Sequence, residues 1–190
     1  RHVARMAYIP VLEPSSPSEA YRYYLEAMAL SRRMKMPVIL RMTTHVCHGK
    51  EKVAFGAWEK KAPGTEPRFD SSAGPSVPLT SAALEMKRRA LARLSLAGCE
   101  MDSPAFCEVR KGSDSFRGVI TAGLPFRSLL NVLEDSEQSP DILKLGVVHP
   151  LPEKTIETFL RAHEEVKILE ELDDVMEKEI KALAFDRGMS

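Results

Sequence analysis

The stretch 9–42, IPVLEPSSPSEAYRYYLEAMALSRRMKMPVILRM, carries the order of strand, helix and strand that decides the fold. It opens with a short apolar run closed by a proline, as at the end of a strand. A helix start follows, with Ser16 at the N-cap, Pro17 at the first helical position and Glu19 completing the S-x-x-E capping box. Pro37 ends the helix, and the apolar run VILRM after it is typical of a parallel strand covered on both faces. The stretch therefore predicts one right-handed βαβ unit.

The helix of this unit has a predicted buried face. Ala20, Tyr24 and Met28 recur at every fourth position with Leu25 alongside, which indicates a wide apolar surface facing a sheet. A sheet needs more strands than one βαβ unit supplies. We expect the missing strands to come from later in the chain or from residues before Arg1.

A linker and a second helix follow. The stretch 62–81, APGTEPRFDSSAGPSVPLTS, contains four prolines, two glycines and four serines, a composition typical of a linker or a long surface loop. The next residues predict a helix at 82–97 that ends at Gly98. Its leucines Leu84, Leu91 and Leu94 fall on one face.

Strands and helices alternate regularly in the last 85 residues. The predicted strands are AFCEVR at an edge, RGVITAG, DILKLGVV and VKILEEL. The predicted helices are 125–135, PEKTIETFLRAH with Ile156, Phe159, Leu160 and His163 on a face, and DDVMEKEIKALAF with Met176, Ile180 and Leu183 inward. This alternation predicts an α/β fold with parallel or mostly parallel sheets and helices on both faces. We divide the chain into domains at 1–61 and 105–190, joined by a linker and connecting helix at 62–104.

Composition excludes several classes of protein. The 190 residues hold 27 basic and 27 acidic side chains, whereas a general nucleic-acid binder carries a basic excess. No apolar run approaches the roughly 18 residues that cross a membrane, and no signal peptide is visible. Since the chain opens at Arg1 without a methionine, we expect a piece of a longer polypeptide.

Three widely spaced cysteines, Cys47, Cys99 and Cys107, form no disulfide framework and contain no C-x-x-C pair. We expect reduced thiols in a cytoplasmic protein. Three cysteines also cannot hold an iron–sulfur cluster alone, because such clusters usually take four cysteine ligands.

The charges are divided unevenly along the chain. Residues 1–61 hold eleven basic and five acidic side chains, and the acidic excess lies in the remainder. Two interpretations are open: two solvated surfaces of opposite sign, or a basic first module that faces the acidic second one or an anionic ligand.

The densest group of reactive side chains is His45, Cys47 and His48 in TTHVCH. A metal site needs three or four converging ligands, and neighbouring positions on an extended segment point to opposite sides. No nucleophile elbow surrounds Cys47 to support a Cys/His catalytic pair. The segment does follow the carboxyl end of a predicted parallel strand, where α/β sheets bind ligands. Thr43, Thr44, His45 and His48 then either face a ligand or form a hydrogen-bonded loop.

Two further segments allow a structural and a functional interpretation. Gly123 in TAGLPFR lies between a strand and a helix, and it forms either a tight turn or a loose phosphate-binding turn without a complete glycine motif. LEELDD places four acids at a strand end, where Asp173 and Asp174 cap a helix or the carboxylates bind Mg²⁺.

Two blocks resemble a known enzyme family. ARMAYIPVLEPSSPSEAYRYYLEAMALSRRMKMPVILRMTTHVCHGK contains a strand ending P-x-L-E-P, the S-x-x-E-A-Y helix start and P-V-I-L-R-x-T-T-x-V-x-H. LKLGVVHPLPEKTIETFL and VKILEELDDVMEKEIKAL add a strand leading to P-L-P and a strand ending in paired glutamates. Together they resemble the large, alpha subunit of indolepyruvate ferredoxin oxidoreductase, within the thiamine-diphosphate-dependent 2-oxoacid:ferredoxin oxidoreductases. The blocks follow the family's order and cover about half the chain, whereas the linker and SPAFCEVRKGSDSFR match little.

The resemblance implies an internal fragment of a larger enzyme. Members oxidatively decarboxylate aryl 2-oxoacids to acyl-CoA with thiamine diphosphate and Mg²⁺, coenzyme A, [4Fe–4S] clusters, a smaller beta subunit and ferredoxin. Residues 1–61 would be the second half of the pyrimidine-binding domain, and 105–190 a transketolase-C-terminal-like domain. Thr43, Thr44 and His48 would lie on a cofactor- or interface-facing loop, without metal.

The resemblance assigns no catalytic residue to this chain, so we expect the fragment alone to be inactive. The exposed edge of its βαβ unit would invite a homodimer. The alternative is a non-catalytic α/β module for binding or subunit interaction.

Overall fold

Two sheets organise the computed structural model, which describes residues 1–57 and 77–189. In the smaller sheet, β1 (Val11–Leu12) pairs in parallel with β2 (Ile39–Leu40) and antiparallel with β6 (Val147–His149). The larger sheet has the order β3-β5-β4-β7. Its strands are β3 (Cys107–Arg110), β5 (Pro140–Leu145), β4 (Asp114–Ala122) and β7 (Glu165–Leu169).

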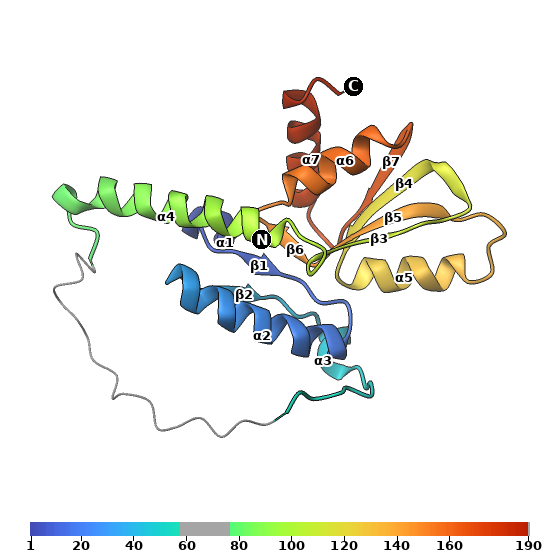
Figure 1. Cartoon of the computed structure of the whole chain (residues 1–190), viewed down its shortest axis with the longest axis horizontal. Coiled ribbons are helices and arrows are strands. Elements are labelled where there is room, and N and C mark those ends of the chain that lie inside the picture. The colour runs from blue at the N-terminus through green and yellow to red at the C-terminus, as the bar shows by residue number, and fades with distance from the viewer. Residues whose placement is uncertain (58–76, 190) are drawn as a thin grey trace.

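Helices cover these sheets as the α/β prediction requires. β4 is parallel to β5 and β7, and only the edge strand β3 is antiparallel. α5 (Leu124–Leu133) covers one face of the larger sheet, while α6 (Glu153–Arg161) and α7 (Val175–Asp186) cover the other (Figure 1). The α/β fold with helices on both faces is confirmed, although the smaller sheet is half antiparallel.

The remaining helices belong to the first half of the chain and its connection to the second. They are α1 (His2–Ala7), α2 (Pro17–Met34), α3 (Thr44–His48) and α4 (Thr80–Met101). In Figure 1, β1 and β2 pass between α4 above and α2 below. Within the described ranges, no helix has the length and apolar character needed to cross a membrane.

α2 begins as predicted but buries a different face. Ser16 Oγ accepts from the Glu19 backbone N–H at 3.3 Å, which confirms the N-cap. The buried side chains are Tyr23, Ala27 and Leu30. The predicted face was wrong: Tyr24 is 53% exposed, Leu25 and Met28 are exposed too, and Ala20 is only partly buried. Apolar residues occur on both sides of this helix, so the pattern alone did not select the side that meets the sheets.

The strand VILRM is parallel to its neighbour, as predicted, but it is not covered on both faces. β2 has two residues and lies at the edge of the smaller sheet. Ile39 is 37% exposed there. The apolar run indicated a central strand because periodicity does not distinguish a buried strand from a short edge strand in a small sheet.

DILKLGVV, predicted as one strand, forms β5 and β6 in different sheets. Gly146 joins them, donating its N–H to the Phe106 carbonyl at 2.6 Å and accepting from the Glu13 N–H at 2.9 Å. A Cβ built on Gly146 would lie 2.0 Å from the Tyr23 hydroxyl oxygen. Because the two strands have only this residue between them, the core is continuous across both sheets and includes Leu12, Tyr23 and Leu143.

α4 is longer than the predicted helix 82–97 and does not end at Gly98. A Cβ on Gly98 would lie 3.1 Å from the Pro150 ring, so this glycine, inside α4, allows the helix to pack closely against Pro150. Ala97 and Met101 are the buried residues, whereas Leu84 and Leu91, on the predicted three-leucine face, are exposed. The predicted linker 62–81 lies largely outside the described residues.

The close approach of Tyr23 predicts that Gly146→Ala destabilises the fold. The added methyl group would displace Tyr23 or the backbone between the sheets, and overpacking of this kind costs about 1–3 kcal/mol. The free energy of unfolding, measured by urea denaturation, should fall by that amount. Gly56→Ala is the control, because a Cβ there lies 3.9 Å from its nearest neighbour. Equal stability of the two variants would contradict the predicted clash.

Candidate functional site

Charged side chains from both sheets meet where their strands end. Glu13 follows β1, Arg41 follows β2 and Glu170 follows β7. Arg1 donates to both Glu13 oxygens, each at 2.7 Å, and to Glu170 at 2.5 Å. Arg41 lies 3.2 Å from Glu13 and 3.4 Å from Glu171. We call these five residues the strand-end cluster.

The strand-end cluster is mostly buried, and its two arginines face three glutamates. Glu13 is 2% exposed, and Arg1 holds it in a bidentate contact that is strong and geometrically specific. Burial opposes the charge of Arg1, but Glu13 and the neighbouring carboxylates outweigh it and raise the pKa of the guanidinium. Each carboxylate is engaged by an arginine, so the cluster fixes the strand ends relative to each other.

LEELDD contributes to this cluster and to a helix cap. Glu170 accepts from the backbone N–H groups of Met176 at 3.0 Å and Glu177 at 2.8 Å, so it caps the N-terminus of α7. Asp174 stands at the N-cap position without a side-chain cap hydrogen bond. The predicted position of Asp174 at the helix start is confirmed, but the side-chain cap hydrogen bonds are accepted by Glu170. Across 1–57 and 77–189, no three His, Cys, Asp or Glu side chains are arranged to hold a metal ion.

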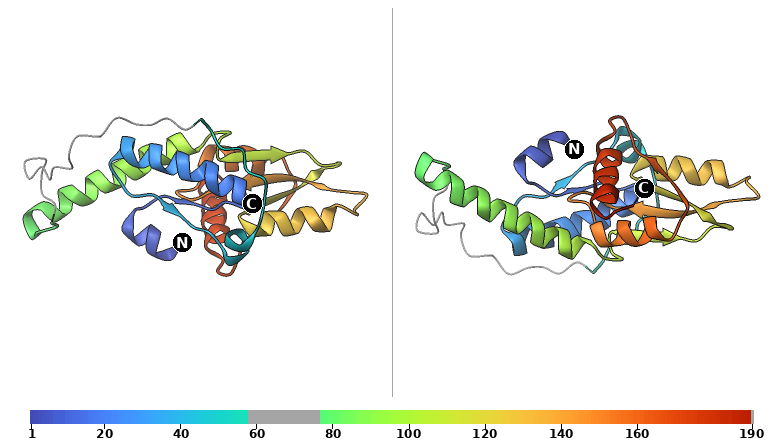
Figure 2. Two further views of the ribbon diagram at one scale, coloured as in Figure 1. Left: turned by 90° about the horizontal axis from the view of Figure 1, so that it is seen from below. Right: turned by 90° about the horizontal axis from the view of Figure 1, so that it is seen from above.

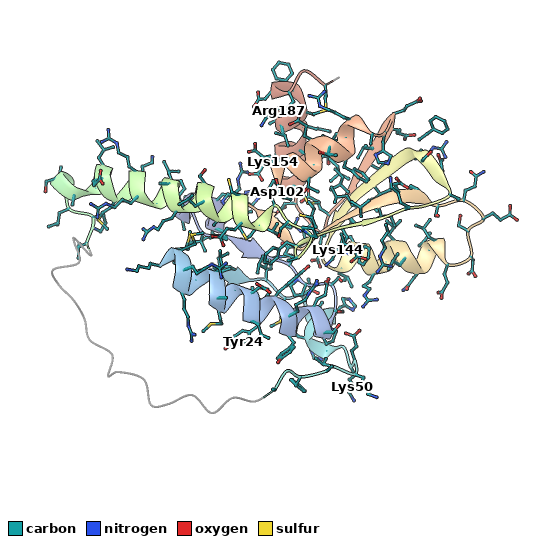
Figure 3. The ribbon with its side chains drawn as sticks, viewed as in Figure 1. Tyr24, Lys50, Asp102, Lys144, Lys154 and Arg187 are labelled. Atoms are coloured by element: carbon teal, nitrogen blue, oxygen red, sulfur yellow. The ribbon has the colours of Figure 1, made fainter. Side chains whose placement is uncertain are left out.

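A second polar cluster lies between α2 and the larger sheet. Lys144 of β5 is 1% exposed, and its Nζ contacts the Glu19 carboxylate and donates to the Tyr23 hydroxyl at 2.9 Å. Glu19 also accepts from the Ser15 N–H at 2.8 Å and the Ser15 hydroxyl at 2.7 Å. Thr121, paired with Lys144 across the sheet, has a buried hydroxyl without a partner in the described residues. Lys144 lies at the centre of Figure 3, where α2 meets the sheet.

The ionisation of this second cluster reflects burial and pairing together. Burial disfavours the Glu19 carboxylate, but Lys144 and Ser15 outweigh it and hold its pKa below the usual value. Burial lowers the pKa of Lys144, and Glu19 opposes that effect. Burial and the Glu19 charge raise the pKa of Tyr23, so its hydroxyl stays protonated. The arrangement is a buried ion pair whose two members come from different modules of the chain.

The TTHVCH segment forms a short helix, so the extended conformation assumed for it was wrong. Thr43 is the N-cap of α3, and its hydroxyl oxygen accepts from the Val46 N–H at 3.5 Å. Thr44, His45, Cys47 and His48 are exposed. The structure places Thr43, Thr44 and His48 on one turn beside α2, and their contact with a cofactor or interface stays a prediction.

Gly123 serves a tight turn next to the strand-end cluster. It is the N-cap of α5 with φ of 59°, a conformation that favours glycine. A Cβ there would lie 3.4 Å from a Glu13 carboxylate oxygen. The glycine thus allows α5 to start close to the end of β1.

Arg1, Glu13, Arg41 and Lys144 were not predicted from the sequence as members of polar clusters. One signal was present for Lys144, because a lysine inside the apolar run ILKLGVV needs a partner wherever that run is buried. Glu13 and Arg41 follow strand ends and Arg1 precedes α1, but nothing local indicates that the ends of two sheets meet.

The chain is similar in sequence to known proteins. No protein-family model matches the chain. The chain is 34% identical over 190 residues to the indolepyruvate oxidoreductase subunit IorA of Methanothermobacter marburgensis, covering 100% of this chain and 30% of that protein. Against the same subunit of Thermococcus kodakarensis the identity is 31% over 193 residues, with 100% of this chain and 30% of that protein covered. The chain thus spans about a third of the length of these relatives.

A solved structure shares the fold. It is the 2-oxoglutarate:ferredoxin oxidoreductase of Magnetococcus marinus with 2-oxoglutarate, coenzyme A and succinyl-CoA bound. The TM-score is 0.61 at 14% identity, with 91% of this chain and 37% of that chain covered. At this identity the comparison supports the α/β arrangement alone.

The buried pair predicts strong coupling between Lys144 and Glu19. Lys144→Met would leave the Glu19 carboxylate buried without its cation, a change that costs about 3–5 kcal/mol. Adding Glu19→Gln should recover part of that loss, because the remaining amide carries no charge. Urea denaturation of the wild type, both single variants and the double variant measures the coupling. Additive losses would show that the pair does not act as a unit.

A separate prediction concerns His149. Burial lowers its pKa to about 4, with the positive charge of Arg5 acting in the same direction. The unfolded chain binds this proton near pH 6.5, so stability should fall as pH drops from about 6.5 toward 4, by about 1–2 kcal/mol at pH 5. His149→Asn should flatten this part of a stability–pH curve, whereas His45→Asn, at an exposed position, should not. An unchanged slope in His149→Asn would contradict the assignment.

Proposed function

Because the chain belongs to the family of the indolepyruvate oxidoreductase subunit IorA, of which it matches one region, we propose that it is part of an enzyme that oxidatively decarboxylates aryl 2-oxoacids. Indolepyruvate is the proposed substrate, an acyl-CoA the product and ferredoxin the electron acceptor. The observation that carries this proposal is the 29–34% identity to six such subunits over nearly the whole chain.

Within that enzyme we assign the two ends of the chain to different domains. Residues 1–61 form the second half of the pyrimidine-binding domain, and the parallel pair of β1 and β2 with α2 between them supports this. Residues 105–190 form the transketolase-C-terminal-like domain, supported by the mostly parallel larger sheet. The segment 62–104 connects them and includes α4.

The residues of this chain do not fit the metal-containing cofactors of the proposed enzyme. Its three cysteines are too few for a [4Fe–4S] cluster, and Cys107 is buried whereas Cys47 and Cys99 are exposed. The acids of the strand-end cluster are held by arginines, so they do not offer the free oxygen ligands that Mg²⁺ bound to thiamine diphosphate needs. We propose that these cofactors are held by parts of the enzyme outside this chain.

The chain's own contribution is then to fix the arrangement of two domains. The strand-end cluster ties the ends of β1 and β2 to β7, and the pair of Lys144 and Glu19 ties α2 to β5. Thr43, Thr44 and His48, exposed at α3, are proposed to face the cofactor or a neighbouring subunit. Coenzyme A, the smaller beta subunit and ferredoxin complete the proposed cytoplasmic enzyme.

The test uses the full-length parent, purified without oxygen together with its partner subunit. With indolepyruvate and coenzyme A, it should reduce a viologen dye at least about tenfold faster than with pyruvate or 2-oxoglutarate, a difference of about 1.4 kcal/mol in activation free energy. The 190-residue chain alone should show no reduction. Omitting coenzyme A is the control for product formation.

Other outcomes would change the proposal. Preference for another 2-oxoacid would keep the reaction and change the substrate. No reduction by a parent loaded with its cofactors would favour a non-catalytic α/β module for binding or subunit interaction.

A further inference from the structure

α4 carries an exposed stripe that no other described element covers. Its N-terminal half extends away from the rest of the molecule in all three views (Figures 1 and 2). Leu84 is 60% exposed and Leu91 is 43% exposed, with Arg88 and Ser95 exposed on the same line. The spacing of four, three and four residues places these side chains on one face of the helix. We call Leu84, Arg88, Leu91 and Ser95 the α4 stripe.

The α4 stripe leads into a groove between α4 and the start of α6. The groove has a volume of about 370 Å³. Leu91, Leu94, Pro150 and Leu151 give it an apolar lining. An exposed apolar line joined to a groove of this kind is the surface on which amphipathic helices dock.

Among the described residues, the acids around this surface already have partners, and two of its cations do not. Glu85 is held by Arg89 at 2.9 Å and Glu153 by Arg187 at 3.3 Å. Asp102 caps α6 by accepting from the Lys154 N–H at 2.9 Å and from Thr155. In the described part of the chain, the side chains of Arg88 and Lys154 have no such partner.

These two cations mark the ends of the surface. Arg88 and Asp102 are separated by about 21 Å along α4, at 1.5 Å per residue. Lys154 lies next to Asp102 at the start of α6 (Figure 3). A ligand that fits both cations must therefore carry negative charges about 20 Å apart, with apolar side chains between them.

We propose that the α4 stripe and its groove bind an acidic amphipathic helix of a partner protein. Leucine-like side chains would cover Leu84 and Leu91 and enter the groove, while carboxylates at the two ends would meet Arg88 and Lys154. A second copy of this chain is the less suitable occupant. Two stripes packed together would bring their arginines close to each other, and like charges across an interface are unfavourable.

The probe is a labelled helical peptide of about 18 residues with leucines at alternating spacings of three and four and glutamates at both ends. Fluorescence anisotropy should show saturable binding to the 190-residue chain that weakens with added salt. Leu84→Ser with Leu91→Ser should weaken binding by at least about tenfold. Arg88→Glu with Lys154→Glu should weaken binding of this peptide to the same extent. This charge-reversed variant should instead bind a matched peptide with lysines in place of the glutamates.

Two control variants distinguish the stripe from a general surface effect. Leu96→Ser removes an exposed leucine from another face of α4, and Arg32→Glu reverses an exposed charge on α2. Both should bind the glutamate peptide as the wild type does. The proposal is overturned if the wild type binds neither peptide or binds both equally, or if the controls lose binding as well. It is also overturned if the chain forms a dimer that is dissociated by the double substitution Leu84→Ser with Leu91→Ser but not by added peptide. A second copy of the chain would then occupy the stripe.

Discussion

The buried contact between Lys144 and Glu19 is the constraint on which the rest of the structure depends. A lysine in the middle of a sheet is costly unless a carboxylate reaches it, and the first turn of α2 supplies one. The contact therefore fixes where α2 starts relative to β5. The same contact sets the positions of Ser15 and of the end of β1, because Ser15 donates two hydrogen bonds to the Glu19 carboxylate.

The strand-end cluster extends this constraint from one helix to two sheets. Glu13 stands close to Gly123 and receives Arg1 and Arg41, so strand ends of both sheets converge on one carboxylate. Such an edge is where α/β proteins bind ligands. Here two arginines engage all three carboxylates, which suits the proposed role in fixing the relative positions of two domains. The α4 stripe lies on a different surface, so the proposed docking of a partner and the proposed alignment of the domains use separate parts of the chain.

The sequence predicted much of the fold because its helix starts and strand ends are marked locally. Ser16, Pro17 and Glu19 marked the start of α2, and the alternation of strands and helices gave the mostly parallel larger sheet with β3 at its edge. Choices that depend on distant contacts were not predictable. The buried side of α2 was set by Lys144 and its contact with Tyr23. The continuation of α4 past Gly98 was set by the contact with Pro150. The split of one apolar run into β5 and β6 was set by Gly146. Of the candidate site, the polar strand ends were recognised in part, but their convergence required the tertiary structure.

Gly146 also limits how this region can change in length during evolution. β5 and β6 follow each other with that single residue between them, and each is paired to a different sheet. Inserting or deleting one residue would turn every side chain of one strand to the opposite face, exchanging its buried and exposed sides. Relatives that share this crossing are therefore expected to align across it without gaps, whereas length differences accumulate in surface loops.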